Sequence, residues 1–149
     1  AMDVPIQAQI LDLLKEQQEK HDMSVILITH NLGIVSGYTD DVAVMYAGKI
    51  VEKCSTRELI SNPIMPYTEA LMNSAPSLAD PPHTRLKAIP GLPPNLLNLP
   101  EGCSFSSRCS YTDQKCINDV PDLTLLKKTK HSFACWYPLA QSATKAAFK

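Results

Sequence analysis

Four cysteines in the C-terminal part of the chain are the residues whose type and spacing could do chemistry. Cys103, Cys109, Cys116 and Cys135 follow the pattern C-x5-C-x6-C-x18-C, whereas Cys54 stands apart. Thiolates are soft ligands that suit zinc and iron–sulfur clusters, and the sequence shows no secretory signal that would favour disulfides. The spacing contains neither a C-x-x-C pair nor a common ferredoxin run. Residue type and spacing therefore leave three alternatives for these cysteines: a zinc site, an iron–sulfur cluster, or free or disulfide-bonded thiols.

His30 is the second candidate for chemistry. It follows Val25–Thr29, a short apolar run without polar alternation, which predicts a parallel strand buried on both faces. Ligands of α/β sheets bind beyond the carboxyl ends of such strands. An imidazole there could donate to a phosphate oxygen or orient a water. The alternative is a partly buried histidine in a turn that carries no chemistry.

The elements around His30 indicate an α/β arrangement. Asp3 can cap a helix that has Pro5 in its first turn and apolar residues at helical spacing. After the strand, residues 31–40 predict a short helix and a turn, and residues 41–53 predict two strands joined near Ala47-Gly48. The order of helix, buried strand and helix is typical of α/β layering.

Two further helices are predicted beyond this hairpin. Ser55 and Glu58 have the spacing of a capping box. Thr68 is expected to cap a helix that carries Ala70 and Leu71. The prolines of residues 86–105 exclude a regular element, and the apolar residues among them predict an ordered strap that runs along a surface.

Composition limits the classes of function. The chain has 149 residues, enough for one domain or two small ones, and 44% of them are apolar, enough for a core. A net charge of -1 offers no general attraction for nucleic acid or anionic lipid. No apolar run approaches the ~18 residues of a membrane span. We therefore expect no nucleic-acid partner and no direct membrane span.

Several stretches resemble one family. "AMDVPIQAQILDLL", "SVILITHNLGIV" and "DDVAVMYAGKIVEK" resemble the final third of an ABC-transporter nucleotide-binding domain. The "PYT" and "IPG-x-PP" segments and the four-cysteine pattern resemble the C-terminal extension of ATP-binding subunits of oligopeptide and dipeptide importers. Met65 stands where that family usually has histidine. The resemblance implies an α/β fold: the C-terminal part of a RecA-like ABC ATPase core over residues 1–61, then a small, irregular proline- and cysteine-rich extension over residues 62–149.

The resemblance also implies roles for individual residues. Asp3 matches the D-loop and would pass across a dimer interface toward the opposite active site. His30 matches the switch histidine, which contacts the γ-phosphate and the attacking water. The four cysteines would hold a [4Fe–4S] cluster, with zinc as the alternative. Arg108 and His131 also match the pattern of the family's C-terminal extension. Each could donate a hydrogen bond to a cluster sulfur or to backbone.

The implied function is the ATPase subunit that couples ATP hydrolysis to peptide import. Such a subunit binds ATP and Mg²⁺, forms a head-to-tail dimer with a second ATP-binding subunit, and docks on membrane permeases at the cytoplasmic face of the cell membrane. The Walker A, signature and Walker B motifs have no counterpart here, so we expect this chain alone to be inactive. The alternatives are a non-catalytic metal-binding interaction module, or the same class of ATPase serving a nickel or oligosaccharide importer.

Overall fold

The computed structural model describes residues 4–75 and 87–139. Asp3, the expected interface residue, lies outside the described residues. Internal contacts divide the chain into two units, Ala1–Thr39 and Asp40–Lys149, and each is described by itself. Within the described ranges, every helix is too short or too polar to cross a membrane.

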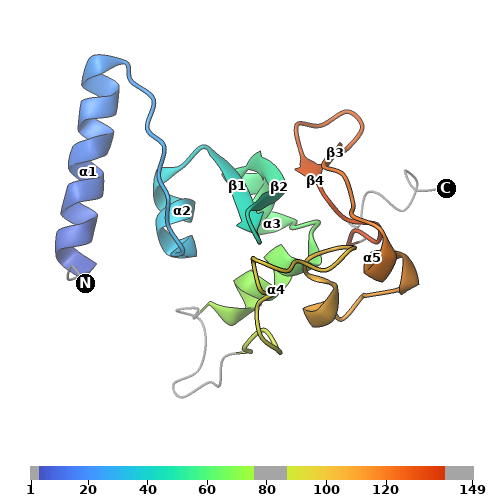
Figure 1. Ribbon diagram of the computed structural model, residues 1–149. Coiled ribbons are helices and arrows are strands. Elements are labelled where there is room, and N and C mark those ends of the chain that lie inside the picture. The colour runs from blue at the N-terminus through green and yellow to red at the C-terminus, as the bar shows by residue number, and fades with distance from the viewer. Residues whose placement is uncertain (1–3, 76–86, 140–149) are drawn as a thin grey trace. The chain divides into compact units, whose positions relative to one another are not determined.

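The described residues of the first unit form helices α1 and α2, both labelled in Figure 1. Helix α1 spans Val4–His21, as the apolar spacing predicted, and it ends with basic residues that suit the negative end of the helix dipole. Helix α2 spans Leu32–Tyr38 and begins where the Asn31 side chain accepts a hydrogen bond from the Gly33 N–H at 2.9 Å. The hydroxyl of Tyr38 donates to Asp12 at 2.9 Å and joins the two helices.

The predicted buried strand at Val25–Thr29 is wrong for the structure described. The segment forms no strand, and the side chains of Ile26 and Ile28 are 91% and 94% exposed. A strand needs a neighbour to accept and donate its backbone hydrogen bonds, and the described residues of this unit include no other strand. Apolar composition cannot supply that neighbour, so the run stays extended and exposed.

The second unit is built on an antiparallel sheet, shown in Figure 1. Strands β1 (Asp41–Tyr46) and β2 (Lys49–Ser55) form the predicted hairpin, and β3 (Thr124–Leu125) and β4 (Ser132–Phe133) extend it in the order β1-β2-β4-β3. Ala47 and Gly48 have φ values of 48° and 80°, as a two-residue hairpin turn requires. The described fold thus combines helices with a sheet, as expected, and its antiparallel sheet is built on the predicted hairpin, without the parallel strand expected at Val25–Thr29.

Helices α3 (Thr56–Ser61) and α4 (Pro66–Ser74) follow the hairpin. The capping box that begins α3 is confirmed, because Ser55 and Glu58 exchange side-chain and backbone hydrogen bonds. The predicted Thr68 cap is wrong, because α4 already begins at Pro66, whose fixed φ suits the first helical position. The Thr68 hydroxyl is buried inside the helix, with no hydrogen-bond partner among the described residues.

One core joins the hairpin to the cysteine-rich part of the unit. Tyr46 of β1, Tyr67 of α4 and Phe105 pack as an aromatic trio with ring centroids 4.5 to 5.3 Å apart. Phe105 directly precedes the 3₁₀ turn η1 (Ser106–Arg108), and the short helix α5 (Gln114–Asn118) comes next. The segments that carry the cysteines are therefore attached to the sheet by aromatic packing.

Candidate functional site

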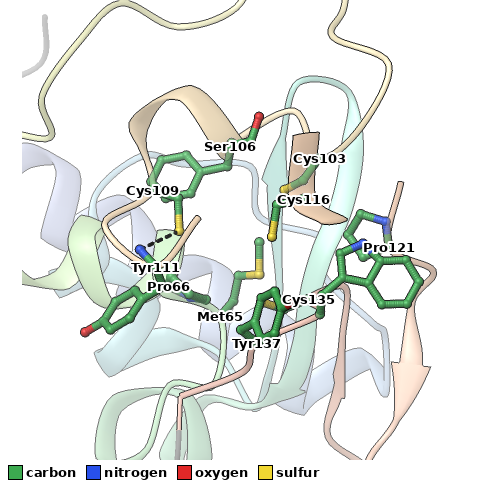
Figure 2. Close-up of a pocket in the computed structure, with 12 residues that line it drawn as sticks. Met65, Pro66, Cys103, Ser106, Cys109, Tyr111, Cys116, Pro121, Cys135 and Tyr137 are labelled. Atoms are coloured by element: carbon green, nitrogen blue, oxygen red, sulfur yellow. Dashed lines mark hydrogen bonds between the residues drawn. The ribbon is translucent and has the colours of Figure 1, made fainter. Parts of the chain in front are cut away.

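The four C-terminal cysteines line one small pocket, shown in Figure 2. They come from separate elements: Cys103 precedes η1, Cys109 ends it, Cys116 lies in α5 and Cys135 follows β4. The pocket holds about 10 Å³, roughly the room of one water molecule. Apolar and aromatic side chains form most of the remaining wall. The structure thus gathers four soft donors in an apolar setting.

The thiols of this pocket form no disulfide bonds. All five cysteines of the chain are free. Burial raises the pKa of Cys103 and Cys109, and it raises the pKa of Cys135 to about 12. The neighbouring cysteines add to each rise because like charges repel. A metal would therefore have to displace the thiol protons in order to bind.

Backbone N–H groups point at three of the sulfurs and oppose this rise in pKa. The Tyr111 N–H donates to Cys109 Sγ at 3.4 Å. The N–H groups of Phe105 and Ser106 lower the pKa of Cys103, and that of Tyr137 lowers the pKa of Cys135. Hydrogen bonds of this kind stabilise a thiolate and tune iron–sulfur centres. These N–H groups would therefore favour the thiolate form of the three cysteines.

The pocket does not have the ligand geometry of a bound ion. Across residues 4–75 and 87–139, no group of three or more His, Cys, Asp or Glu side chains is arranged to hold a metal ion. The four thiols are present, but they are not arranged as ligands of one shared ion. A cluster takes one thiolate per iron, which spreads its four ligands more widely than a single ion does.

Gly102 allows Cys103 to approach α5 closely, a role that the sequence analysis missed. A Cβ at this position would lie 2.3 Å from the carbonyl oxygen of Cys116 and 2.4 Å from that of Ile117, so no other residue fits without movement of the backbone. The Cys103 N–H donates to the same Cys116 carbonyl at 2.8 Å. A glycine directly before a cysteine was the available signal.

His131 lies beside a carboxylate, not a sulfur. Its Nε2 is 2.7 Å from Glu52 Oε1, and the two side chains are 3% and 0% exposed. Glu52 also accepts hydrogen bonds from the backbone N–H groups of Ile64 at 2.7 Å and Met65 at 3.3 Å. Glu52 was missed by sequence reasoning, because an acidic residue in a strand ordinarily indicates an exposed position.

Arg108 binds backbone, one of the two roles expected for it. Its Nε donates to the carbonyl of Pro90 at 2.9 Å, and Nη2 donates to that of Ile89 at 3.2 Å. Its Nη1 donates to the Tyr46 hydroxyl at 3.3 Å. Arg108 therefore fastens the start of the proline-rich strap to the hairpin.

His30, in the first unit, is exposed between the extended segment and α2. The next residue, Asn31, donates its N–H to Thr29 Oγ1 at 3.0 Å and caps α2 with its side chain. These local bonds fix the backbone on either side of the imidazole. The side chain is thus accessible to a ligand, while its backbone is held.

Part of the chain matches a described protein family. Residues 51–116 match the family described as oligopeptide/dipeptide transporter, C-terminal region. A peptide import ATP-binding protein of Brucella melitensis is 43% identical over 147 residues, which cover 94% of this chain and 43% of that protein. The dipeptide transport ATP-binding protein DppD of Bacillus subtilis is 46% identical over 136 residues, covering 91% of this chain and 40% of DppD.

The oligopeptide transport ATP-binding protein OppD of Bacillus subtilis is 45% identical over 136 residues, which cover 91% of this chain and 38% of OppD. The chain therefore spans less than half the length of the curated relatives it matches. Over this part of their length, the chain is similar to oligopeptide and dipeptide transport ATP-binding proteins.

Proposed function

We propose that this chain is the C-terminal part of an ATPase subunit that couples ATP hydrolysis to peptide import through membrane permeases. The observation that carries the proposal is identity of 43–46% to peptide import and transport ATP-binding proteins over 91–94% of the chain. The match over residues 51–116 to the C-terminal region of such transporters supports the placement within the subunit. The subunit would act at the cytoplasmic face of the cell membrane.

In this proposal His30 acts at the γ-phosphate. Phosphoryl transfer depends mainly on positioning and on stabilisation of developing charge. An accessible imidazole on a locally fixed backbone can donate to a γ-phosphate oxygen and orient the attacking water. Mg²⁺ and the other phosphate oxygens need the glycine-rich Walker A loop and the Walker B carboxylates. Neither motif has a counterpart in this sequence. Asp3 would contact the second ATP-binding subunit of a head-to-tail dimer.

The test uses the complete subunit that carries this sequence. Reconstituted with its permeases in liposomes, it should hydrolyse ATP faster when peptide and its binding protein are supplied, and labelled peptide should accumulate inside. Nickel ions and oligosaccharides serve as competing cargoes. Uptake of either in place of peptide, or hydrolysis that is indifferent to all three, would overturn the proposal.

We further propose that Cys103, Cys109, Cys116 and Cys135 hold a metal centre, a [4Fe–4S] cluster, with zinc as the alternative. Support comes from the shared pocket and from the N–H groups directed at three sulfurs. When bound, such a centre would stabilise the extension through its ligand bonds, as structural metals do in other small domains. Metal analysis of anaerobically purified protein is the test.

A further inference from the structure

We propose that Glu52 and His131 are positioning residues for the four-cysteine pocket, holding two of its walls in place from outside it. This inference rests on the proposed function of that pocket. One wall is the start of α4 at Met65 and Pro66, and the other is the segment after β4 that carries Cys135. Neither Glu52 nor His131 lines the pocket itself.

Glu52 reaches the first wall through backbone hydrogen bonds. Its two carboxylate oxygens accept from the N–H groups of Ile64 and Met65, at 2.7 and 3.3 Å. Met65 is the residue before α4 and has no side-chain cap of its own. Glu52 is therefore the group on β2 that fixes where this helix begins.

Met65 links the start of α4 to the cysteines, because its side chain forms part of their pocket. Its side chain is 2% exposed and lines the pocket, and Figure 2 shows its thioether reaching in among the cysteine side chains. Pro66, the first residue of α4, lines the pocket as well. A shift of the Ile64–Met65 backbone would therefore move a wall of the pocket directly.

His131 is connected to the second wall through the backbone of β4, which directly follows it and leads to Cys135. Its backbone carbonyl accepts from the Leu126 N–H at 2.8 Å, which closes the turn between β3 and β4. Directly after it, Ser132 and Phe133 pair with Lys53 and Glu52 of β2. The Ala134 N–H then donates to Val51 at 2.8 Å, and Cys135 comes next. The Glu52–His131 contact thus locks the register that delivers Cys135 to the pocket.

Loss of the Glu52–His131 contact should destabilise this part of the unit, because both side chains are buried. Removing His131 takes from the buried Glu52 carboxylate one of its three hydrogen-bond partners, and such a loss inside the protein is not made good by water. Such a cost is relieved by local opening when the affected segment has few other anchors. Here β3 and β4 are only two residues each, so the segment near Cys135 should open first.

The test measures thiol exposure in the reduced, metal-free chain. Pulsed alkylation with mass spectrometry gives a separate rate for each cysteine, and buried Cys54 of β2 reports opening of the sheet core. We expect His131→Ala and Glu52→Gln to raise the alkylation rate of Cys135 about tenfold to a hundredfold, while the rate of Cys54 stays within about twofold. Glu101→Gln, at an exposed acidic residue, is the control and should change neither rate.

A conservative variant separates positioning from a general packing role. Glutamine at position 131 still offers an N–H donor to Glu52, so His131→Gln should keep the Cys135 rate near that of the wild type. Unchanged Cys135 rates in His131→Ala and Glu52→Gln would overturn the inference. So would an equal rise at Cys54, which would show that the pair holds the whole unit, or a His131→Gln rate equal to that of His131→Ala.

The alkylation assay needs no bound metal, so it is independent of the proposed metal centre. If the wild type binds no metal but the rates follow the expected pattern, the positioning role stands and the metal centre fails. If metal binds stoichiometrically but the rates do not change, the metal centre stands and the positioning role fails.

Discussion

Arg108 Nε donates to the carbonyl oxygen of Pro90 at 2.9 Å, across 18 residues of sequence. The same guanidinium holds the carbonyl of Ile89, whose side chain packs against the core. Gly91 follows with a φ of 74°, and the chain turns there, directly after the two residues that Arg108 binds. Beyond it the strap exposes leucine side chains, 86% at Leu92 and 97% at Leu97. One arginine therefore fastens the start of a segment that is otherwise largely exposed.

Arg108→Lys should loosen this strap. Lysine offers one nitrogen, whereas the planar guanidinium serves three acceptors in fixed directions. We expect limited proteolysis within residues 91–99 to become about tenfold faster, because local opening exposes the cleavage sites. Arg57→Lys, at an exposed position of α3, is the matched control and should leave the rate unchanged. Equal cleavage in wild type and Arg108→Lys would contradict the clamp.

Local signals in the sequence predicted the elements that depend on local bonds. The β1–β2 turn needs positive φ at both central residues, and the glycine of Ala47-Gly48, which adopts it without a Cβ penalty, was the signal that marked the turn. The start of α3 needs only the reciprocal bonds of Ser55 and Glu58. Thr68 failed as a cap because Pro66, two residues earlier, is the stronger signal for a helix start.

Features that depend on distant partners could not be predicted. The run Val25–Thr29 has a strand's composition, but strand formation requires a neighbouring backbone. The burial of Glu52 depends on His131, 79 residues away, and no periodicity within β2 reveals that partner. The cysteines were singled out by residue type, yet their shared pocket is set by the packing of η1, α5 and β4.

In the complete subunit, His30→Ala should lower turnover far more than ATP affinity. A contact to the γ-phosphate strengthens as charge develops in the transition state, and loss of one such donor typically costs about 10²–10³ in rate. His21→Ala, at an exposed histidine of α1, is the control. Steady-state hydrolysis gives kcat, and nucleotide titration gives the affinity. Parallel falls in both quantities, or no fall in either, would mean that His30 has only a structural role.

The 149-residue chain alone should neither bind nor hydrolyse ATP. The sequence has no glycine-rich G-x-x-x-x-G-K-[ST] loop to cradle the β- and γ-phosphates. Without those contacts, ground-state binding is lost together with catalysis. Equilibrium binding of a fluorescent ATP analogue and a phosphate-release assay measure the two. Phosphate release above a buffer blank that disappears in His30→Ala would refute this expectation.

The four pocket cysteines should act as one metal-binding unit. After anaerobic purification, iron, sulfide and zinc are quantified in the wild type and in single Cys→Ser variants. A full cubane gives about four irons per chain and a broad absorbance near ~400 nm, whereas zinc gives a colourless protein with one ion. Cys54→Ser is the matched control, because Cys54 lies in β2 outside the pocket and should keep full metal content. A wild type without stoichiometric metal, or a Cys116→Ser variant that retains it, would disprove a four-ligand site.

The reduced, metal-free chain should lose stability as the pH rises above the ordinary thiol range. Burial raises the pKa of Cys54 and of Cys135 to about 12, from the ordinary thiol value of 9.0. Between these values the unfolded chain has released thiol protons that the folded chain still holds, so the free energy of unfolding falls with increasing pH. Below pH 9 both states hold these thiol protons, so the stabilisation from the raised pKa values is fully present.

Urea unfolding between about pH 8 and about pH 10.5 measures the effect. Cys54→Ala removes one of the two strongly shifted thiols, so its stability should decline less steeply with pH than that of the wild type, even if its stability at the lowest pH is lower. Comparing the two proteins cancels the titration of tyrosines and lysines that both retain. Identical slopes would show that the Cys54 thiol titrates alike in the folded and unfolded chains.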